Sequence, residues 1–425
     1  MSRILSLPLA LWVSVLLFLS LGTSFFSFEV AGARVYIFDL IAVFLLLYFL
    51  LQCGSVRLKA YNIRMLLGVY FYIALLISLP LFVSVLNNEQ VSGVLLTSAR
   101  FFLLSILILL APILVSESYD IQLVFYNCLG FMIALNFIYG LLQLLEFQNV
   151  IPYGVLPHHW VYSDNEWFKF DDWGRSSGLL KGPNELGWFG VIAFSLVLAK
   201  YIQKSTLLNL VMLLMAASLP FVSNSRSAIL GLIIAYITSL ILVVIFLFAS
   251  RNSSLSRMYF KYLLLFVPIG AGAVGMAWLF FDYLKIDRLW SGVVSVLGLE
   301  EDTSLSGRLD MWQGVVSLLN QNNGWLFGLG VNPDSLFGAV DSGWLSYIVK
   351  GGLVLAFTFF IVLLVLFIQS ILIFRKTRKP FFLGVSLVWV AVIVGLFFVE
   401  VQHFSSILLL YVAYSMVLAD CHKRG

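Results

Sequence analysis

The chain has 425 residues, of which 61% are hydrophobic and 11% are charged, with a mean hydropathy of +1.02 and a net charge of +4 at pH 7. This apolar content exceeds what a soluble domain needs, and separate apolar runs of about 20 residues are typical of helices that cross a bilayer. The runs do not alternate as barrel strands do, so the sequence predicts an all-α polytopic membrane protein. The three cysteines form no CxxC pair, and no His/Cys group has zinc spacing, so we expect no disulfide framework, no metal ion and no cofactor.

Twelve membrane spans are predicted in chain order, at residues 5–24, 36–52, 65–86, 93–115, 122–146, 186–203, 206–222, 227–249, 259–281, 351–374, 381–399 and 403–419. The first lacks a clear cleavage site and is interpreted as a retained anchor rather than a signal peptide. Lys and Arg in the short loops set the orientation. With the N-terminus in the cytoplasm, the cytoplasmic side receives more than half of the 25 basic residues, and the C-terminus is cytoplasmic too.

Two segments, 147–185 and 282–350, break the rhythm of short loops, and both fall on the outer side. We expect a single integral membrane domain over 1–425 with these two long outer loops, the second containing short amphipathic helices. Loops of this length are usually functional. The chain has no glycine-rich phosphate loop, so we expect neither ATP nor a nucleotide-sugar donor from the cytoplasm to drive its chemistry.

Arg226 lies in the stretch SNSRS, at the predicted outer end of the span 227–249. A helix start exposes N–H groups and carries a partial positive charge. Together with the neighbouring hydroxyl groups and the guanidinium, it would suit a phosphate. The alternative is a helix cap whose arginine reaches lipid head groups.

Two further arginines fall on the same predicted side. Arg308, in SLSGR, is expected at another helix start with Ser306 as its cap, or on an amphipathic helix at the membrane surface. Arg100 lies inside the span 93–115, where an arginine costs several kcal/mol unless it is paired or faces water. It could instead extend towards the outer surface, or pair with Asp39 or Glu146.

Three arginines in one outer cavity would match a diphosphate on a membrane lipid, because the planar guanidinium binds two oxygens at once. No carboxylate-rich metal cage accompanies them in the sequence. We therefore expect guanidinium groups, rather than a tightly bound divalent ion, to neutralise the diphosphate.

Three passages resemble the bacterial O-antigen polymerase and ligase superfamily. Residues 177–199 (SGLLKGPNELGWFGVIAFSLVLA) resemble the family's G-x-x-x-x-P-N-x-x-(G/A) entry to a span. SNSRSAILGLIIA resembles its S-R-(S/G)-A segment. Residues 306–364 resemble its succession of SGR, W, G-x-G, D-S-x-(Y/W)-L and G-x-(I/L/V).

The resemblance implies an integral-membrane (GT-C-like) glycosyltransferase that acts at the periplasmic face of the bacterial inner membrane on glycans linked to undecaprenyl diphosphate. Ligases of the family typically carry a His-Asn pair where this chain has Asp341-Ser342, and 282–350 contains no His. This departure favours a polymerase that transfers the growing glycan to a sugar hydroxyl of the next lipid-linked unit, a step in O-antigen, lipopolysaccharide or exopolysaccharide synthesis.

The alternatives are a ligase acting on lipid A core or protein, a flippase or exporter of lipid-linked sugars, and a scaffold. The implied partners are a flippase and a chain-length regulator, with no nucleic acid.

The proposed chemistry needs stabilisation of a departing diphosphate and an acceptor for the proton of the attacking hydroxyl. Arg226 and Arg308 are predicted to stabilise the leaving group, with Arg100 behind them. Asp341 is the first candidate base, although it could instead cap the short helix SGWLSYIVK, and His403 is the second, although it could be structural.

Other polar residues of the outer side are predicted to bind substrate. Lys181, Asn184 and Glu185 open a span in KGPNELG, where a Pro-Asn turn and helix cap is the simpler interpretation. The aromatic loop 153–178 suits a glycan-binding surface, since aromatic faces stack on sugars, but aromatics also anchor proteins at the interface. Its candidate residues are His158, His159, Trp173 and Arg175.

Overall fold

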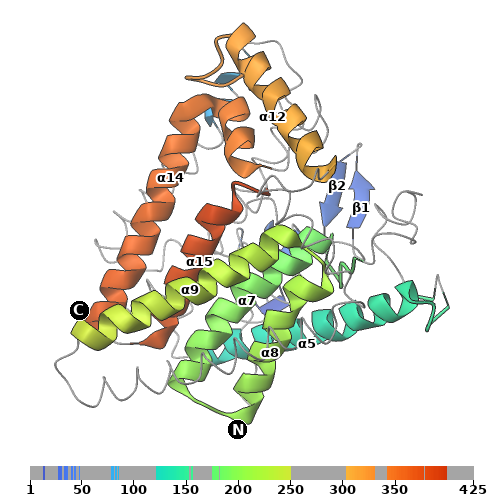
Figure 1. Ribbon diagram of the computed structural model, residues 1–425, viewed down its shortest axis with the longest axis vertical. Helices are drawn as coiled ribbons and strands as arrows, with labels where there is room; N and C mark the ends of the chain where they lie inside the picture. Colours follow the sequence, from blue (N-terminus) through green and yellow to red (C-terminus); the bar gives the residue numbers. More distant parts are fainter. Residues whose placement is uncertain are drawn as a thin grey trace. The chain divides into compact units, whose positions relative to one another are not determined.

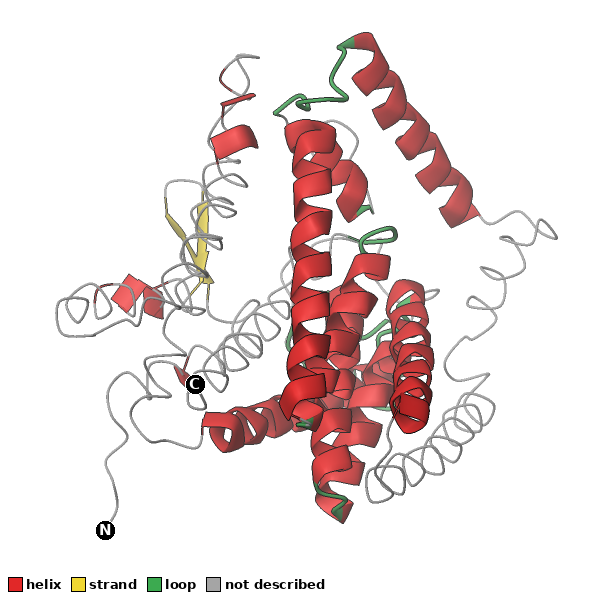
Figure 2. Ribbon diagram, turned by 90° about the vertical axis from the view of Figure 1, so that its left-hand side faces the viewer, coloured by secondary structure: helices red, strands yellow, loops and turns green. Residues whose placement is uncertain are grey.

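The computed structural model describes residues 121–152, 155–156, 175–180, 182–249, 303–330, 342–377 and 379–399, and short pieces of the first 85 residues (13–14, 27–30, 33–36, 40–41, 43–44, 47, 78–80, 82–83 and 85). Helices make up most of this part (Figure 2). They are α5 (Ile121–Phe147), α7 (Pro183–Gln203), α8 (Leu207–Val222), α9 (Arg226–Ala249), α12 (Thr303–Gln321), α14 (Gly343–Thr377) and α15 (Pro380–Gly395) (Figure 1).

The described strands form one short antiparallel hairpin, β1 (Ser27–Val30) and β2 (Ala33–Tyr36), in which Ser27 pairs with Tyr36 and Val30 with Ala33. Two four-residue strands are too few to bury a core of their own. The described part of the chain is therefore mainly helical, as predicted. The hairpin was not predicted from the apolar runs.

Three of the described helices are long and apolar enough to cross a membrane: Gln122–Phe147, Pro183–Gln203 and Gly343–Thr377. Shorter apolar helices cover Leu207–Val222, Arg226–Leu242 and Pro380–Gly395. These helices fall on the predicted spans 122–146, 186–203, 206–222, 227–249, 351–374 and 381–399, so the chain is a helical protein with membrane-length helices. The other predicted spans, 5–24, 36–52, 65–86, 93–115, 259–281 and 403–419, lie wholly or largely outside the described residues, and twelve remains a predicted number.

The chain forms two compact units. Unit 1 comprises Met1–Leu129, Ser306–Val365 and Leu396–Gly425, and unit 2 comprises Gly130–Leu305 and Leu366–Gly395.

Helix α7 is the centre of unit 2. Of its most apolar 18-residue window, 94% is buried, because α8, α9 and α15 all pack on it. A helix that is apolar on every side belongs in a core of this kind. The turn between α7 and α8 is short, and Thr206 caps α8 by accepting a hydrogen bond from the N–H of Asn209 at 3.3 Å. The start of α7 and the end of α8 therefore lie at the same end of the unit.

Close helix contacts in unit 2 depend on glycines. A Cβ on Gly187 would lie 2.7 Å from Cβ of Ala228 in α9, and a Cβ on Gly190 would lie 2.7 Å from Cβ of Leu219 in α8. Small residues let helix backbones approach in this way. The indole of Trp188, which is fully buried, lies against Gly231 of α9 and Gly395 at the end of α15. These contacts fix the first turns of α7 against α9.

In unit 1, α12 packs on the first segment of α14. Its stripe of Val315 and Leu319 forms a buried cluster with Leu329 and Val349. Trp312, Leu318, Trp325, Leu345 and Ile348 pack around this cluster. The apolar face of α12 is thus buried at least in part within the protein, and is not wholly left for a membrane surface.

Helix α14 has a sharp kink, which is stabilised by the segment that follows α12. The backbone departs from helical angles at Gly351 and at Gly352, whose φ is +70°. The N–H groups that follow the kink are bonded by carbonyls of this segment, Leu353 N to Trp325 O at 2.7 Å and Val354 N to Leu326 O at 3.3 Å. A Cβ on Gly352 would collide with the backbone of Leu326, so only glycine fits this position. The kink separates the predicted short helix 342–350 from the predicted span 351–374.

Candidate functional site

The starts of α7 and α9 are joined by a network of hydrogen bonds within unit 2. Oδ1 of Asn184, in the first turn of α7, accepts from Nη2 of Arg175 at 2.7 Å and from Oγ of Ser225 at 3.0 Å. Arg175 also donates from Nε to the carbonyl of Ser223 at 3.4 Å. Ser225 immediately precedes α9, and its carbonyl accepts the first helical hydrogen bond, from Ile229 N. We call Arg175, Asn184, Ser223 and Ser225 the α7–α9 joint.

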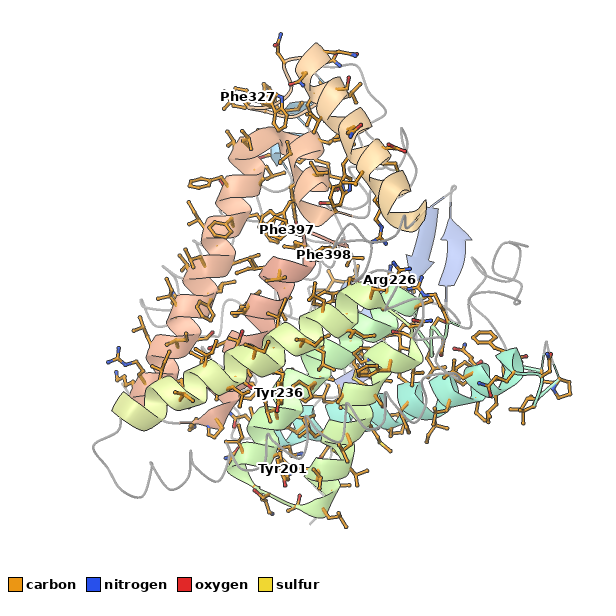
Figure 3. The ribbon with its side chains drawn as sticks, viewed as in Figure 1. Tyr201, Arg226, Tyr236, Phe327, Phe397 and Phe398 are labelled. Carbon is orange, nitrogen blue, oxygen red and sulfur yellow. The ribbon has the colours of Figure 1, made fainter. Side chains whose placement is uncertain are left out.

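The joint places Arg226 where two helices begin. Arg226 is the first residue of α9, and its side chain is half-buried. Figure 3 labels it at the end of unit 2 where α7 starts, while Tyr201 in the last turn of α7 lies at the opposite end. At 1.5 Å per residue, Asn184 and Lys204 are separated by about 30 Å, the thickness of a hydrocarbon core. Arg226, which lies near the start of α7, is therefore roughly the thickness of a hydrocarbon core away from Lys204.

Positive and negative charges both lie at this end of unit 2. Gly182 provides no side-chain cap for α7, and Pro183 at its first position has no N–H to satisfy. Helix starts carry partial positive charge, and two of them meet here beside the guanidinium groups of Arg175 and Arg226. Glu185 is the acid in the first turn of α7 and is buried, with 3% of its surface exposed, so it offsets part of this positive potential.

The segment Arg175–Leu180, which we call the bracket, ties the joint to α5. Oε1 of Gln143 in α5 accepts from Ser177 N at 3.1 Å and Gly178 N at 2.8 Å, and its Nε2 donates to Gly178 O at 3.2 Å. Gly178 has a φ of +57°, which glycine tolerates best. The same Gln143 oxygen accepts from Ser176 Oγ at 2.7 Å, and Asn136 Oδ1 accepts from Leu179 N at 3.1 Å.

Gln143 and Asn136 were not singled out from the sequence. They lie seven residues apart on one face of α5, are almost fully buried, and hold a backbone segment rather than a substrate. The signal that could have identified them is the presence of four amide side chains, theirs among them, in a membrane-length apolar helix, where unsatisfied polar groups are costly.

One polar atom next to the joint has no partner among the described residues. Asn224 lies in the turn between α8 and α9 with a φ of +46°, and 6% of its surface is exposed. Its Oδ1 is buried without a hydrogen-bond donor in the described part of the chain. Asparagine tolerates this backbone conformation, so the residue suits the turn even with that atom unsatisfied.

For Arg308, one expectation is wrong. Helix α12 begins at Thr303, so Ser306 is inside the helix and is not its cap, and Arg308 lies in the second turn rather than at the start. The free N–H groups and the dipole effect are confined to the first turn. Arg308 can therefore offer a guanidinium, but not a helix N-terminus, to an anion. Thr303–Leu305 already belong to α12, so the helix starts three residues before the expected cap.

The short helix before the kink begins as expected, with a different cap. Ser342 Oγ accepts from Leu345 N at 3.5 Å, and Ser342 O accepts from Ser346 N at 3.0 Å. The capping position that the sequence offered to Asp341 is thus occupied by Ser342. Two side-chain atoms near this part of unit 1, Trp312 Nε1 and Ser346 Oγ, are buried without a partner among the described residues.

The remaining predicted site residues lie outside the described part. They are Arg100, His158, His159, Trp173, Lys181, Asp341 and His403. Of the others, Arg175, Asn184, Glu185 and Arg226 come together in unit 2, and Arg308 belongs to unit 1. The packing of α7 against α9 thus brings two motifs that are distant in sequence, 175–185 and 223–227, to the same end of unit 2. Comparison of the chain with models of known protein families and with curated proteins finds no match.

Proposed function

We propose that this chain is a membrane glycosyltransferase that polymerises oligosaccharide repeat units carried on undecaprenyl diphosphate, for an O-antigen or exopolysaccharide. In this proposal the protein lies in the bacterial inner membrane and transfers the growing glycan to a sugar hydroxyl of the incoming unit at the periplasmic face. The α7–α9 joint is the observation that carries the proposal, because it brings two helix starts and hydroxyl groups together next to Arg226.

The role proposed for Arg226 is to stabilise the leaving diphosphate. As the glycosidic bond to the carrier breaks, negative charge grows on the phosphate oxygens, and a fixed guanidinium favours that change most when water is excluded. Arg308 is proposed to share this role, and Asp341 to accept the proton of the attacking hydroxyl. A flippase that delivers units and a chain-length regulator are the proposed partners.

The experiment is complementation of a strain that lacks the protein, followed by separation of the glycan products on a gel. We expect Arg226→Ala and Arg308→Ala to reduce the ladder to a single repeat while lipid-linked units still reach the periplasm. Lys204→Ala is the control, because Lys204 is an exposed cation at the opposite end of α7. Units retained in the cytoplasmic leaflet would indicate transport, and full-length chains left on the carrier would indicate a ligase; either result would overturn the proposal.

A further inference from the structure

Arg175 has a different place in the structure from the one its sequence suggests. It lies in the aromatic loop 153–178 and is predicted from the sequence to bind substrate, but two of its hydrogen bonds join it to the protein itself. Nη2 bonds Asn184 of α7 at 2.7 Å, and Nε bonds the carbonyl of Ser223, in the turn that precedes α9, at 3.4 Å. One guanidinium therefore connects the beginnings of two helices. Lysine could not do this with the same geometry, because its single ammonium lacks the planar fork.

The turn that Arg175 holds is the one that positions Arg226. Asn224 N bonds Phe221 O at 2.9 Å and Ser225 N bonds Pro220 O at 3.2 Å, so the turn is compact and ends directly at Arg226. On its other side the turn packs against Gly187, where an added Cβ would meet Ser223 Oγ at 2.8 Å. A displacement of Ser223 would therefore be transmitted to the first residue of α9.

The backbone that follows Arg175 is anchored to α5. The three residues that follow it donate hydrogen bonds to Gln143 Oε1, and all of them are buried. Since Gln143 belongs to α5, the backbone next to Arg175 is fixed independently of α7 and α9. A fixed donor that reaches two helix starts is the arrangement expected of a side chain that sets their relative position.

We infer that Arg175 is a positioning residue that holds the start of α9 against the start of α7 and thereby places the Arg226 guanidinium. This inference rests on the proposed function for the reaction that Arg226 serves. It assigns Arg175 no contact with substrate, and it predicts that the effect of losing Arg175 depends on the residue at 226.

The first test is hydrogen exchange of the purified full-length protein in detergent. Arg175→Ala should raise the exchange rate of amides 223–229 about tenfold, since local opening follows the loss of a charged hydrogen bond. Amides of α15 should be unchanged. Arg375→Ala is the matched control, an exposed arginine at the far end of α14, and it should leave 223–229 as in the wild type. Unchanged exchange in Arg175→Ala would overturn the inference.

The second test is a double-mutant cycle on polymerisation rate. Arg175→Ala should lower the rate about tenfold when residue 226 is arginine, because small misplacements of a reacting group are costly. In an Arg226→Lys background it should lower the rate less than twofold, since the oriented fork is already lost. A tenfold loss in both backgrounds would show that Arg175 acts on substrate by itself and would overturn the inference. If exchange rises as expected but the wild type makes no polymer, the placement of Arg226 is supported and the proposed function is overturned.

Discussion

Gln143→Met should destabilise the protein by releasing the bracket from α5. Gln143 is buried and takes part in four hydrogen bonds with Ser176, Ser177 and Gly178. Methionine has a similar volume but no amide, so Ser177 N and the Ser176 hydroxyl lose the acceptor that Gln143 supplies. Gly178 O keeps its contact with Ser177 Oγ at 3.4 Å. Gly178 N keeps its contact with Ser176 Oγ at 3.2 Å. At about 1–3 kcal/mol for each buried group left unpaired, two such groups cost roughly 2–6 kcal/mol.

The assay is thermal unfolding of the purified protein in detergent, followed by loss of the monodisperse peak in size-exclusion chromatography. A cost of this size should lower the Tm by on the order of 5 °C or more. Gln148→Met is the matched control, because Gln148 lies just past the end of α5 and is exposed. If Gln143→Met unfolds at the same temperature as Gln148→Met, the bracket does not depend on Gln143 and the reasoning is refuted.

Three further predictions concern packing and unpaired groups. Gly187→Val should destabilise the protein by about 1–3 kcal/mol through overpacking against Ala228 and Ser225, whereas Gly307→Ala, with nothing within 4 Å, should not; equal Tm values for the two would contradict the close α7–α9 contact. Gly352→Ala should cost more stability than Gly351→Ala, because the first collides with the backbone of Leu326 and the second meets the flexible Leu355 side chain; the reverse order of Tm would contradict the kink geometry. Trp312→Phe removes a buried N–H that has no partner among the described residues, which offsets part of the packing that the smaller ring loses. Trp325→Phe breaks a 2.7 Å bond to Asn320 and should cost about 1 kcal/mol, so Trp312→Phe should lower the Tm no more than Trp325→Phe does; a larger loss in Trp312→Phe would contradict this account.

The helices were predictable because hydrophobic runs of membrane length have few other structures available to them. The run 227–249 corresponds closely to α9, and the Gly351-Gly352 pair marks the end of the short helix that precedes the long span. Helix ends were less predictable. Ser306 has the side chain of a cap but lies inside α12, which begins three residues earlier at Thr303, because a capping preference alone does not fix where a helix starts.

The site was predictable in its residue types but not in their partners. A polar segment at the start of a span indicates a helix terminus, and both KGPNELG and SNSRS proved to be helix starts. That Asn184 would bond Ser225, or that Arg175 would reach Ser223, depends on how α7 and α9 pack, which periodicity alone does not determine. Gln143 and Asn136 bind the backbone of a segment more than 30 residues away, a contact with no local signal.

The central claim is that Arg226, held at the α7–α9 joint, binds the diphosphate of a polyprenyl carrier. The most direct measurement is the affinity of the purified protein for undecaprenyl diphosphate, by ligand-induced thermal stabilisation or native mass spectrometry. We predict that Arg226→Ala weakens binding about 100-fold, as expected for the loss of a bidentate charged contact, while Lys204→Ala binds like the wild type. Equal affinity of Arg226→Ala and wild-type protein would contradict the claim.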